Sequence, residues 1–232
     1  MTAFPASPCV VRHAAPSMLF SMDDDCGRAD DWLLDLALLS IREARQAPLS
    51  SVTARMHRPP FWPEIWPGEH YKLLWGIVAA LGPTRIVEVG TYTGLSALAM
   101  LASLTPAARL TTYDVLPWDA IPETCLCPAD FADGRLVQHI SDLSDPAAFA
   151  SHSSTIQNAD LIFVDGPKDG AFEERFLHHL GGLRFERAPL VVLDDIRLWN
   201  MLAPWRGISA PKLDLTSFGH WSGTGLVHWT SS

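Results

Sequence analysis

Residues 85–104 read RIVEVGTYTGLSALAMLASL, and this stretch decides the expected fold. Residues 86–89 form an apolar run typical of a buried strand, a turn with Gly90 and Gly94 follows, and a helix is expected to begin near Leu95. Gly90 lets a ligand approach the backbone where a Cβ atom would block it, and Gly94 lets the helix start close to the strand. Glu88 is unusual, because a carboxylate inside an apolar strand costs several kcal/mol unless a partner compensates it.

The two glycines follow the spacing Gly-x-x-x-Gly, which is neither the dinucleotide-binding pattern Gly-x-Gly-x-x-Gly nor a phosphate-binding loop. The spacing therefore counts against NAD and ATP as cofactors. The stretch resembles motif I of class I S-adenosylmethionine (SAM) methyltransferases, and more narrowly the metal-dependent O-methyltransferases typified by catechol O-methyltransferase. This resemblance implies that the turn holds the methionine part of SAM and that the cofactor contacts include Glu88, Gly90, Tyr92, Gly94 and Ser96.

Polar residues follow the next two expected strands. Residues 110–113 form the second strand and end in Asp114, about twenty residues beyond the glycine turn, where a carboxylate can accept hydrogen bonds from a ribose diol. Asp is also common at strand ends because it forms turns. Residues 135–140 form the third strand, and the resemblance places Ser141 and Asp142 beside the adenine ring. Asp142 could instead cap a helix that begins near Pro146.

Three more carboxylates follow two later strands. In the stretch ADLIFVDGPKDGAF, residues 161–164 are uninterruptedly apolar, as expected of a central parallel strand, and Asp165 ends them. Residues 189–193 repeat the pattern and are followed by Asp194 and Asp195. Because ligands gather at the carboxyl ends of parallel strands, these carboxylates are expected to meet in one cleft. They would repel one another there unless a hard divalent cation, Mg²⁺ above all, lay between them.

This constellation is similar to the metal site of catechol O-methyltransferase and its relatives. The resemblance implies Asp165, Asp194 and Asp195 as metal ligands and Lys168 as the base, with Asp165 also lying at the catalytic and cofactor sites. The family commonly has Asn where this chain has Asp195, and residues 166–167 also depart from the family, so the metal preference and the contacts at that point stay open. Read separately, the aspartates at 194 and 195 could cap a helix, and Lys168 could be a solvated loop charge.

The N-terminal third has no counterpart in the resembled family. Residues 1–25 are expected to form a loosely ordered arm, and a helix over residues 31–46 is expected to be capped by Asp30 or Asp31. Residues 56–74 hold four prolines among large aromatic side chains, which predicts a loop that is either a substrate wall or lid, or a plug of the core.

A helix over residues 69–81 leads into the first strand. In the resembled family this helix borders the methionine end of SAM, which makes Glu69 and His70 weak candidates for contact. At the other end of the chain, two strand-like segments flank residues 220–223 and predict a hairpin, and the resemblance makes the last strand antiparallel. Between them, residues 196–208 carry Trp199, Met201 and Trp205, which line either a substrate pocket or the core.

These elements predict an α/β fold: a Rossmann-like, doubly wound, mostly parallel sheet with an antiparallel C-terminal strand and helices on both faces. We divide the chain into an N-terminal arm and helix, residues 1–60, that serves as a lid or an oligomer contact, and a SAM-binding methyltransferase domain, residues 61–232. A homodimer would be one such oligomer.

Composition limits the partners. The formal net charge of −9 repels phosphate backbones, so nucleic acid is not an expected partner. The four cysteines, Cys9, Cys26, Cys125 and Cys127, have no metal-ligand spacing and are expected to be free thiols in a reducing compartment, with residues 118–134 as a surface loop. The sequence has no secretory leader and no apolar run of membrane-spanning length, so we expect a cytoplasmic protein without a membrane partner.

The resemblance implies a SAM-dependent O-methyltransferase that methylates a hydroxyl of a small molecule and uses a divalent cation to activate it. Two alternatives remain: a metal-independent N- or O-methyltransferase in which the same residues orient the substrate, and a non-catalytic module of this fold that binds the nucleoside and a protein partner.

Overall fold

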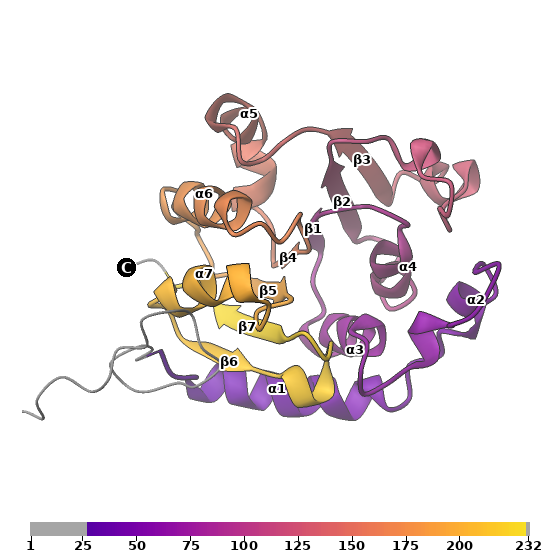
Figure 1. Ribbon diagram of the computed structural model, residues 1–232, viewed down its shortest axis with the longest axis horizontal. Coiled ribbons are helices and arrows are strands. Elements are labelled where there is room, and N and C mark those ends of the chain that lie inside the picture. The colour runs from indigo at the N-terminus through magenta and orange to yellow at the C-terminus, as the bar shows by residue number, and fades with distance from the viewer. Residues whose placement is uncertain (1–26, 231–232) are drawn as a thin grey trace, which may run out of the picture.

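The computed structural model describes residues 27–230, which form a seven-stranded sheet with helices packed around it (Figure 1). The predicted arm over residues 1–25, with Cys9, and the neighbouring Cys26 lie outside the described residues. The helices are α1 (Asp31–Ala44), α2 (Ser50–Thr53), α3 (Tyr71–Leu81), α4 (Leu95–Leu101), α5 (Pro146–Gln157), α6 (Ala171–Gly181) and α7 (Leu202–Gly207). The strands are β1 (Arg85–Val89), β2 (Arg109–Asp114), β3 (Leu136–Ile140), β4 (Leu161–Val164), β5 (Leu190–Asp194), β6 (Lys212–Asp214) and β7 (Thr224–His228).

The strand order is β3-β2-β1-β4-β5-β7-β6. The five strands from β3 to β5 in this order run parallel, whereas β7 is antiparallel to both β5 and β6. The predicted fold class, including the antiparallel C-terminal strand, is therefore confirmed. Because the order reverses between β1 and β4, the carboxyl ends of these two strands flank the crevice where such sheets bind ligands.

Alternate residues of each strand enter two separate cores, one on each face of the sheet. In β1, Ile86 packs with α1, α3 and α4, whereas Val87 packs with α5, α6 and α7. Figure 1 shows these two groups of helices on opposite sides of the strands. The parallel strands β4 and β5 are buried along their whole length, which explains their uninterrupted apolar sequences.

Helix α1 begins where the sequence predicted, because the Asp30 side chain accepts a hydrogen bond from the Leu33 N–H. The buried face differs from the apolar residues that suggested the helix: Leu39 is exposed, and Ser40 is buried against α3. A Cβ atom on Gly76 of α3 would lie 2.3 Å from the Ser40 carbonyl oxygen. Close packing of small residues therefore decides which face turns inward.

Helix α1 is also fastened to the last strand. The Asp30 carboxylate lies 2.6 Å from Nδ1 of His228, and the Trp32 ring lies 4.2 Å from the His228 ring, centroid to centroid. Helix α1 packs extensively on α3 as well. The N-terminal helix is therefore joined to elements on the far side of the predicted boundary at residue 60.

The loop over residues 118–134 is less exposed than the sequence suggested. Cys125 is buried, and its neighbour Leu126 packs in the core near Gly94. Arg55 holds this loop by a bidentate ion pair with Asp130, with N–O distances of 2.6 and 2.8 Å. The free thiol of Cys125 is thus a core side chain and not a surface group.

Within residues 27–230, no helix has both the length and the apolar composition needed to cross a lipid bilayer.

Candidate functional site

A cavity of about 500 Å³ lies at the carboxyl ends of the five parallel strands β1 to β5. Most of the residues predicted to bind cofactor or to act in catalysis line it: Gly90, Tyr92, Asp114, Ser141, Asp142, Asp165, Lys168 and Asp195. Pro167, Phe172 and Tyr113 add apolar walls. This size and position suit a nucleoside cofactor.

The turn after β1 has the close backbone approach that its glycines predicted. Gly90 has φ +97°, and a Cβ atom there would lie 2.0 Å from the carbonyl oxygen of Asp165. Asp114 fixes the turn from the next strand, since one carboxylate oxygen accepts the N–H groups of Thr91 and Tyr92 at 2.9 and 3.0 Å. The other oxygen accepts the N–H of Leu116. A carboxylate has about four acceptor positions, so Asp114 keeps about one for a ligand.

Glu88, Gly94 and Ser96 do not line this cavity. The Ser96 hydroxyl donates a 2.5 Å hydrogen bond to Glu88, whose other oxygen is buried without a partner. Burial raises the pKa of Glu88 to about 7, and the Ser96 hydrogen bond opposes this shift. These residues connect β1 to α4 inside the fold, and their direct contact with a cofactor stays a prediction.

Ser141 and Asp142 lie at the cavity edge after β3. Asp142 accepts a hydrogen bond from the Ser144 N–H at 2.8 Å. The alternative role of Asp142 as the cap of α5 is wrong, because Asp145 caps that helix through the Ala148 N–H. Asp142 therefore forms a local turn through its Oδ1 atom and lines the cavity.

The three carboxylates after β4 and β5 come together, as the sequence predicted. Oxygen atoms of Asp165, Asp194 and Asp195 all lie within 4.8 Å of one another. The Lys168 ammonium bonds directly to Asp165 and lies 3.5 Å from Oδ2 of Asp195. Lys168 and Asp195 both have positive φ, at +61° and +62°, so the backbone is bent to hold these side chains in the cleft.

Two histidines complete the cluster, and the sequence analysis gave little weight to either. His70, just before α3, has Nδ1 3.3 Å from Oδ1 of Asp194, and His220, before β7, has Nδ1 3.1 Å from Oδ2. His220 also contacts Asp195, at 3.2 Å, and Ser222. These histidines lie 150 residues apart in the sequence, and the backbone pairing of Gly68 with His220 brings their two segments together.

The charges in the cluster stabilise one another. Burial opposes the charged form of Lys168, but Asp165, Asp194 and Asp195 outweigh it and raise the lysine pKa far above its ordinary value. Burial likewise opposes ionisation of Asp194, yet the histidines and Lys168 hold its pKa far below normal. Two carboxylates raise the pKa of His220 to about 10 against the effect of burial. At neutral pH the cluster therefore contains cations of its own.

A second cavity, of about 570 Å³, lies beside the cluster. His220 and Glu69 line it, and Tyr92 lines both this cavity and the first one. Its remaining walls combine two kinds of side chain. Aromatic and proline side chains come partly from the loop that the sequence predicted as a wall or a plug: Pro59, Pro60, Trp62, Tyr71 and Trp221. The others are polar or aliphatic: Met56, His57, Arg58, Thr93, Leu95, Glu123 and Cys125. The loop thus forms the wall of a cavity, while Trp205 and Met201 are buried in the body of the protein.

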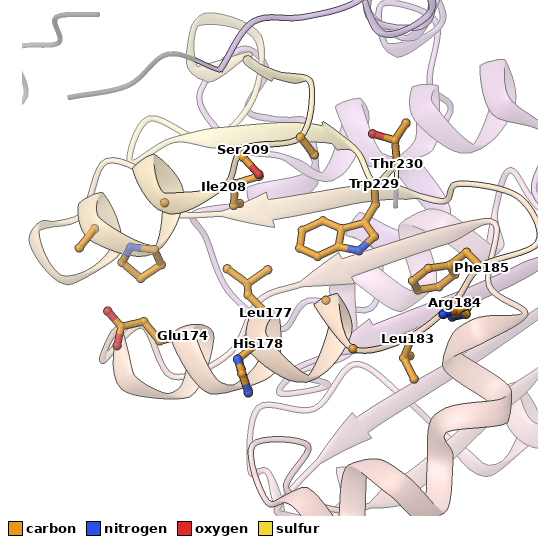
Figure 2. A pocket seen from close by; sticks show the side chains of 16 residues that line it. Glu174, Leu177, His178, Leu183, Arg184, Phe185, Ile208, Ser209, Trp229 and Thr230 are labelled. Atoms are coloured by element: carbon orange, nitrogen blue, oxygen red, sulfur yellow. The ribbon is translucent and has the colours of Figure 1, made fainter. Parts of the chain in front are cut away.

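A larger cavity, about 870 Å³, lies elsewhere, between α6, α7 and the end of β7. Figure 2 shows Leu177, Phe185 and Trp229 directed into it. It contains none of the predicted site residues, and the carboxylate cluster is absent from its walls. We therefore place the candidate active site at the two cavities that meet at Tyr92 and the cluster.

Neither a protein-family model nor a curated protein matches the sequence. Solved structures are similar to it. Cofactor-bound Rv0187 from MTB aligns over 87% of this chain and 96% of its own, with 21% identity and a TM-score of 0.52. A Corynebacterium glutamicum protein aligns over 83% and 91%, with 16% identity and a TM-score of 0.52. A Klebsiella pneumoniae protein provisionally named an O-methyltransferase aligns over 85% and 90%, with 18% identity and a TM-score of 0.50. The chain therefore has the fold of an O-methyltransferase, as the resemblance of residues 85–104 predicted.

Proposed function

We propose that this protein is a SAM-dependent O-methyltransferase that acts on a hydroxyl group of a small molecule and uses a divalent cation, Mg²⁺ in the first instance. One observation carries the proposal. A cavity suited to a nucleoside has Asp165 and Asp195 in its walls. A second cavity shares Tyr92 with it and is lined by His220, which contacts Asp194 and Asp195. A methyl donor in the first cavity would face an acceptor in the second.

The residues of the first cavity suit SAM. The bent backbone at Gly90 leaves space where a side chain would collide with Asp165, and the remaining acceptor position of Asp114 suits a ribose hydroxyl. Asp142, which also lines this cavity, would accept a hydrogen bond from the amino group of the adenine. SAM bound here would supply a methyl group on a positively charged sulfur, which an acidic cleft tolerates.

The carboxylate cluster suits a hard cation in its donor atoms. Asp165, Asp194 and Asp195 would hold the ion, and Oδ1 of Asp194 is buried without a hydrogen-bond partner. A divalent cation there would act as a Lewis acid that lowers the pKa of an acceptor hydroxyl. Asp195 in place of the family's usual Asn adds one negative charge to this set.

The charge of Lys168 limits its role. The surrounding carboxylates keep its pKa high, so it is an ammonium that donates hydrogen bonds to Asp165. It can accept a proton only after a cation or a substrate has taken over those carboxylates. Until then Lys168 orients Asp165 and can donate a hydrogen bond to the acceptor oxygen.

Methyl transfer from a sulfonium to an oxyanion removes charge in the transition state, so alignment and exclusion of water matter more than stabilisation of a new charge. The aromatic and proline walls of the second cavity provide that exclusion. They suit a flat ring, while His57, Arg58 and Glu123 in the same walls suit polar groups on that ring.

A metal-independent methyltransferase is the second candidate, and one contact favours it. The ammonium of Lys168 already compensates Asp165 and Asp195, so these two carboxylates do not need an ion to coexist. In that case the cluster would orient the acceptor by hydrogen bonds alone.

Incubation with methyl-labelled SAM and a panel of vicinal-dihydroxy compounds, with and without EDTA, separates these functions. We expect labelled product that disappears with EDTA and returns with Mg²⁺. Full activity in EDTA would support the metal-independent enzyme. SAM binding without transfer to any compound would favour the non-catalytic module.

A further inference from the structure

Asp194 belongs to two groups of potential metal ligands. One is the carboxylate set with Asp165 and Asp195, and the other is formed with His70 and His220. The first set already has a cation of the protein, since Lys168 bonds to Asp165 and approaches Asp195.

His70 is buried, with 3% of its surface exposed, and neither ring nitrogen has a hydrogen-bond partner. Oδ1 of Asp194, 3.3 Å from Nδ1 of His70, is also buried without one. Buried polar atoms without partners are rare because each costs free energy. These two atoms lie at ion-pair distance without forming a well-aligned hydrogen bond, and a metal ion between them would satisfy both.

The spacing of the three side chains suits one metal ion. The Asp194 oxygens lie 3.3 Å from Nδ1 of His70 and 3.1 Å from Nδ1 of His220. Metal bonds to imidazole and carboxylate are about 2.0–2.2 Å long, so ligand atoms on one ion lie about 3–3.5 Å apart. Nδ1 of His220 also contacts Ser222 and Asp195, so a bound ion would take the place of the proton that these contacts share, and the other nitrogen lies 3.7 Å from Glu69.

We infer that His70, Asp194 and His220 form a binding site for a divalent transition-metal ion such as Zn²⁺ or Co²⁺. Two imidazoles and one carboxylate favour such borderline ions, whereas Mg²⁺ prefers oxygen ligands alone. Glu69 then accepts a hydrogen bond from the free nitrogen of His220 and orients the ring.

The site faces the acceptor cavity, because His220 and Glu69 both line it. An ion with three protein ligands keeps coordination positions open on that side. Ion binding itself does not depend on methyl transfer, whereas a role for the ion in holding the acceptor rests on the proposed function.

The test is a titration of the full-length, metal-free protein with Co²⁺, followed by visible absorption, and with Zn²⁺ and Mg²⁺, followed by calorimetry, all without SAM or acceptor. We expect one tight site for Co²⁺ and Zn²⁺ that Mg²⁺ does not displace. His220→Asn removes a ligand that is 19% exposed at its side chain, and should lower Co²⁺ affinity by more than the roughly 100-fold that loss of an outer partner can cost.

Two variants serve as controls for the titration. Asp165→Asn removes a member of the carboxylate set only and should leave Co²⁺ affinity unchanged. His152→Asn removes a histidine that packs edge-on against Tyr113 and lies beside His139, outside the proposed ligand set, and reports on adventitious binding. Loss of the tight site in Asp165→Asn with retention in His220→Asn would overturn the inference.

His70→Gln extends the test to the buried ligand, provided that circular dichroism shows a folded protein. A measurement on the unaltered protein covers the case in which it does not fold: Cu²⁺ bound at the site should show electron-spin coupling to two imidazole nitrogens. Absence of that coupling, or absence of a tight site, would contradict the inference. A tight site in a protein that methylates nothing would leave the inference intact and remove only the proposed function.

Discussion

The two cavities that meet at Tyr92 are built in different ways. The cofactor cavity is shaped by backbone, above all the bent turn at Gly90, and by single residues that directly follow β2, β3 and β4. The acceptor cavity is shaped by side chains from segments far apart in the sequence, from residues 56–62 to residues 220–221. The difference teaches that a local motif specifies where a cofactor lies, whereas the acceptor and its chemistry depend on how distant loops meet.

The largest expected effect comes from Asp194→Asn, which should change turnover without changing cofactor affinity. Asp194→Asn removes the one carboxylate that faces both histidines and the other aspartates, and we expect turnover to fall by at least about 100-fold, as when a reacting group is misplaced. Affinity for S-adenosylhomocysteine, measured by calorimetry, should not change because Asp194 is absent from the walls of the cofactor cavity. A parallel loss of cofactor affinity would show that the cavities are one unit.

Glu88 lies in β1, the strand that leads into the Gly90 turn, and its protonation in the folded protein can be tested. The folded protein keeps a proton on Glu88 up to about pH 7, whereas the unfolded chain releases it near pH 4.5. Between these values the folded state binds more protons, so this residue lowers the free energy of unfolding as pH rises, by about 3 kcal/mol in all.

Glu88→Gln should remove that part of the pH dependence. Urea unfolding of the two proteins at pH 4.5, 6 and 8 measures it as a difference in stability that widens in favour of the variant as pH rises. Parallel pH profiles of the two proteins would contradict the assigned proton.

Asp114→Asn should weaken cofactor binding without affecting the acceptor side. The variant loses charge-assisted hydrogen bonds to the Gly90 turn and to the ribose, and we expect the dissociation constant of S-adenosylhomocysteine to rise about tenfold, near 1.4 kcal/mol. Turnover at saturating SAM should stay near the parent value. A lower turnover with unchanged cofactor affinity would place Asp114 on the acceptor side instead.

Substitution of Tyr92, which lines both cavities, should have the smallest effect on ligand binding. Its side chain is 64% exposed, so Tyr92→Phe should change cofactor and acceptor binding by no more than about 0.5 kcal/mol each. Tyr92→Ala, the matched variant, removes the ring and should weaken both. An effect of Tyr92→Ala on one ligand only would assign the ring to a single cavity.

The sequence predicted the cofactor side because its signals are local. The turn with Gly90, the residue Asp114 at the end of β2 and the buried strands before Asp165 and Asp194 each follow from neighbouring residues, and parallel strands bring their ends together without further information. The apolar residues of α1 predicted the helix but not its buried face, because Gly76 and Ser40 allow a contact that hydrophobicity does not record.

The acceptor side was harder to predict because its partners are distant in the chain. Lys168 was expected as a base near a metal, but its contacts with two carboxylates make it their counter-ion. His70 and His220 gave a weak signal: each stands next to an element boundary, and neither belongs to a spaced ligand motif. The sequence therefore did not predict that these two histidines lie together.

The hydrogen bond between Asp30 and His228 limits the movement of α1 when an acceptor enters. Because this hydrogen bond joins the start of α1 to the end of β7, swinging α1 outward would pull on the sheet itself. The loop over residues 56–62 is held by an exposed ion pair between Arg58 and Glu123, at 3.9 Å, and beside its ends by Arg55 with Asp130 and by the Trp66 ring with the Phe218 carbonyl oxygen. Exposed ion pairs contribute little stability, so we expect this loop to shift more readily than α1 when a molecule enters the second cavity.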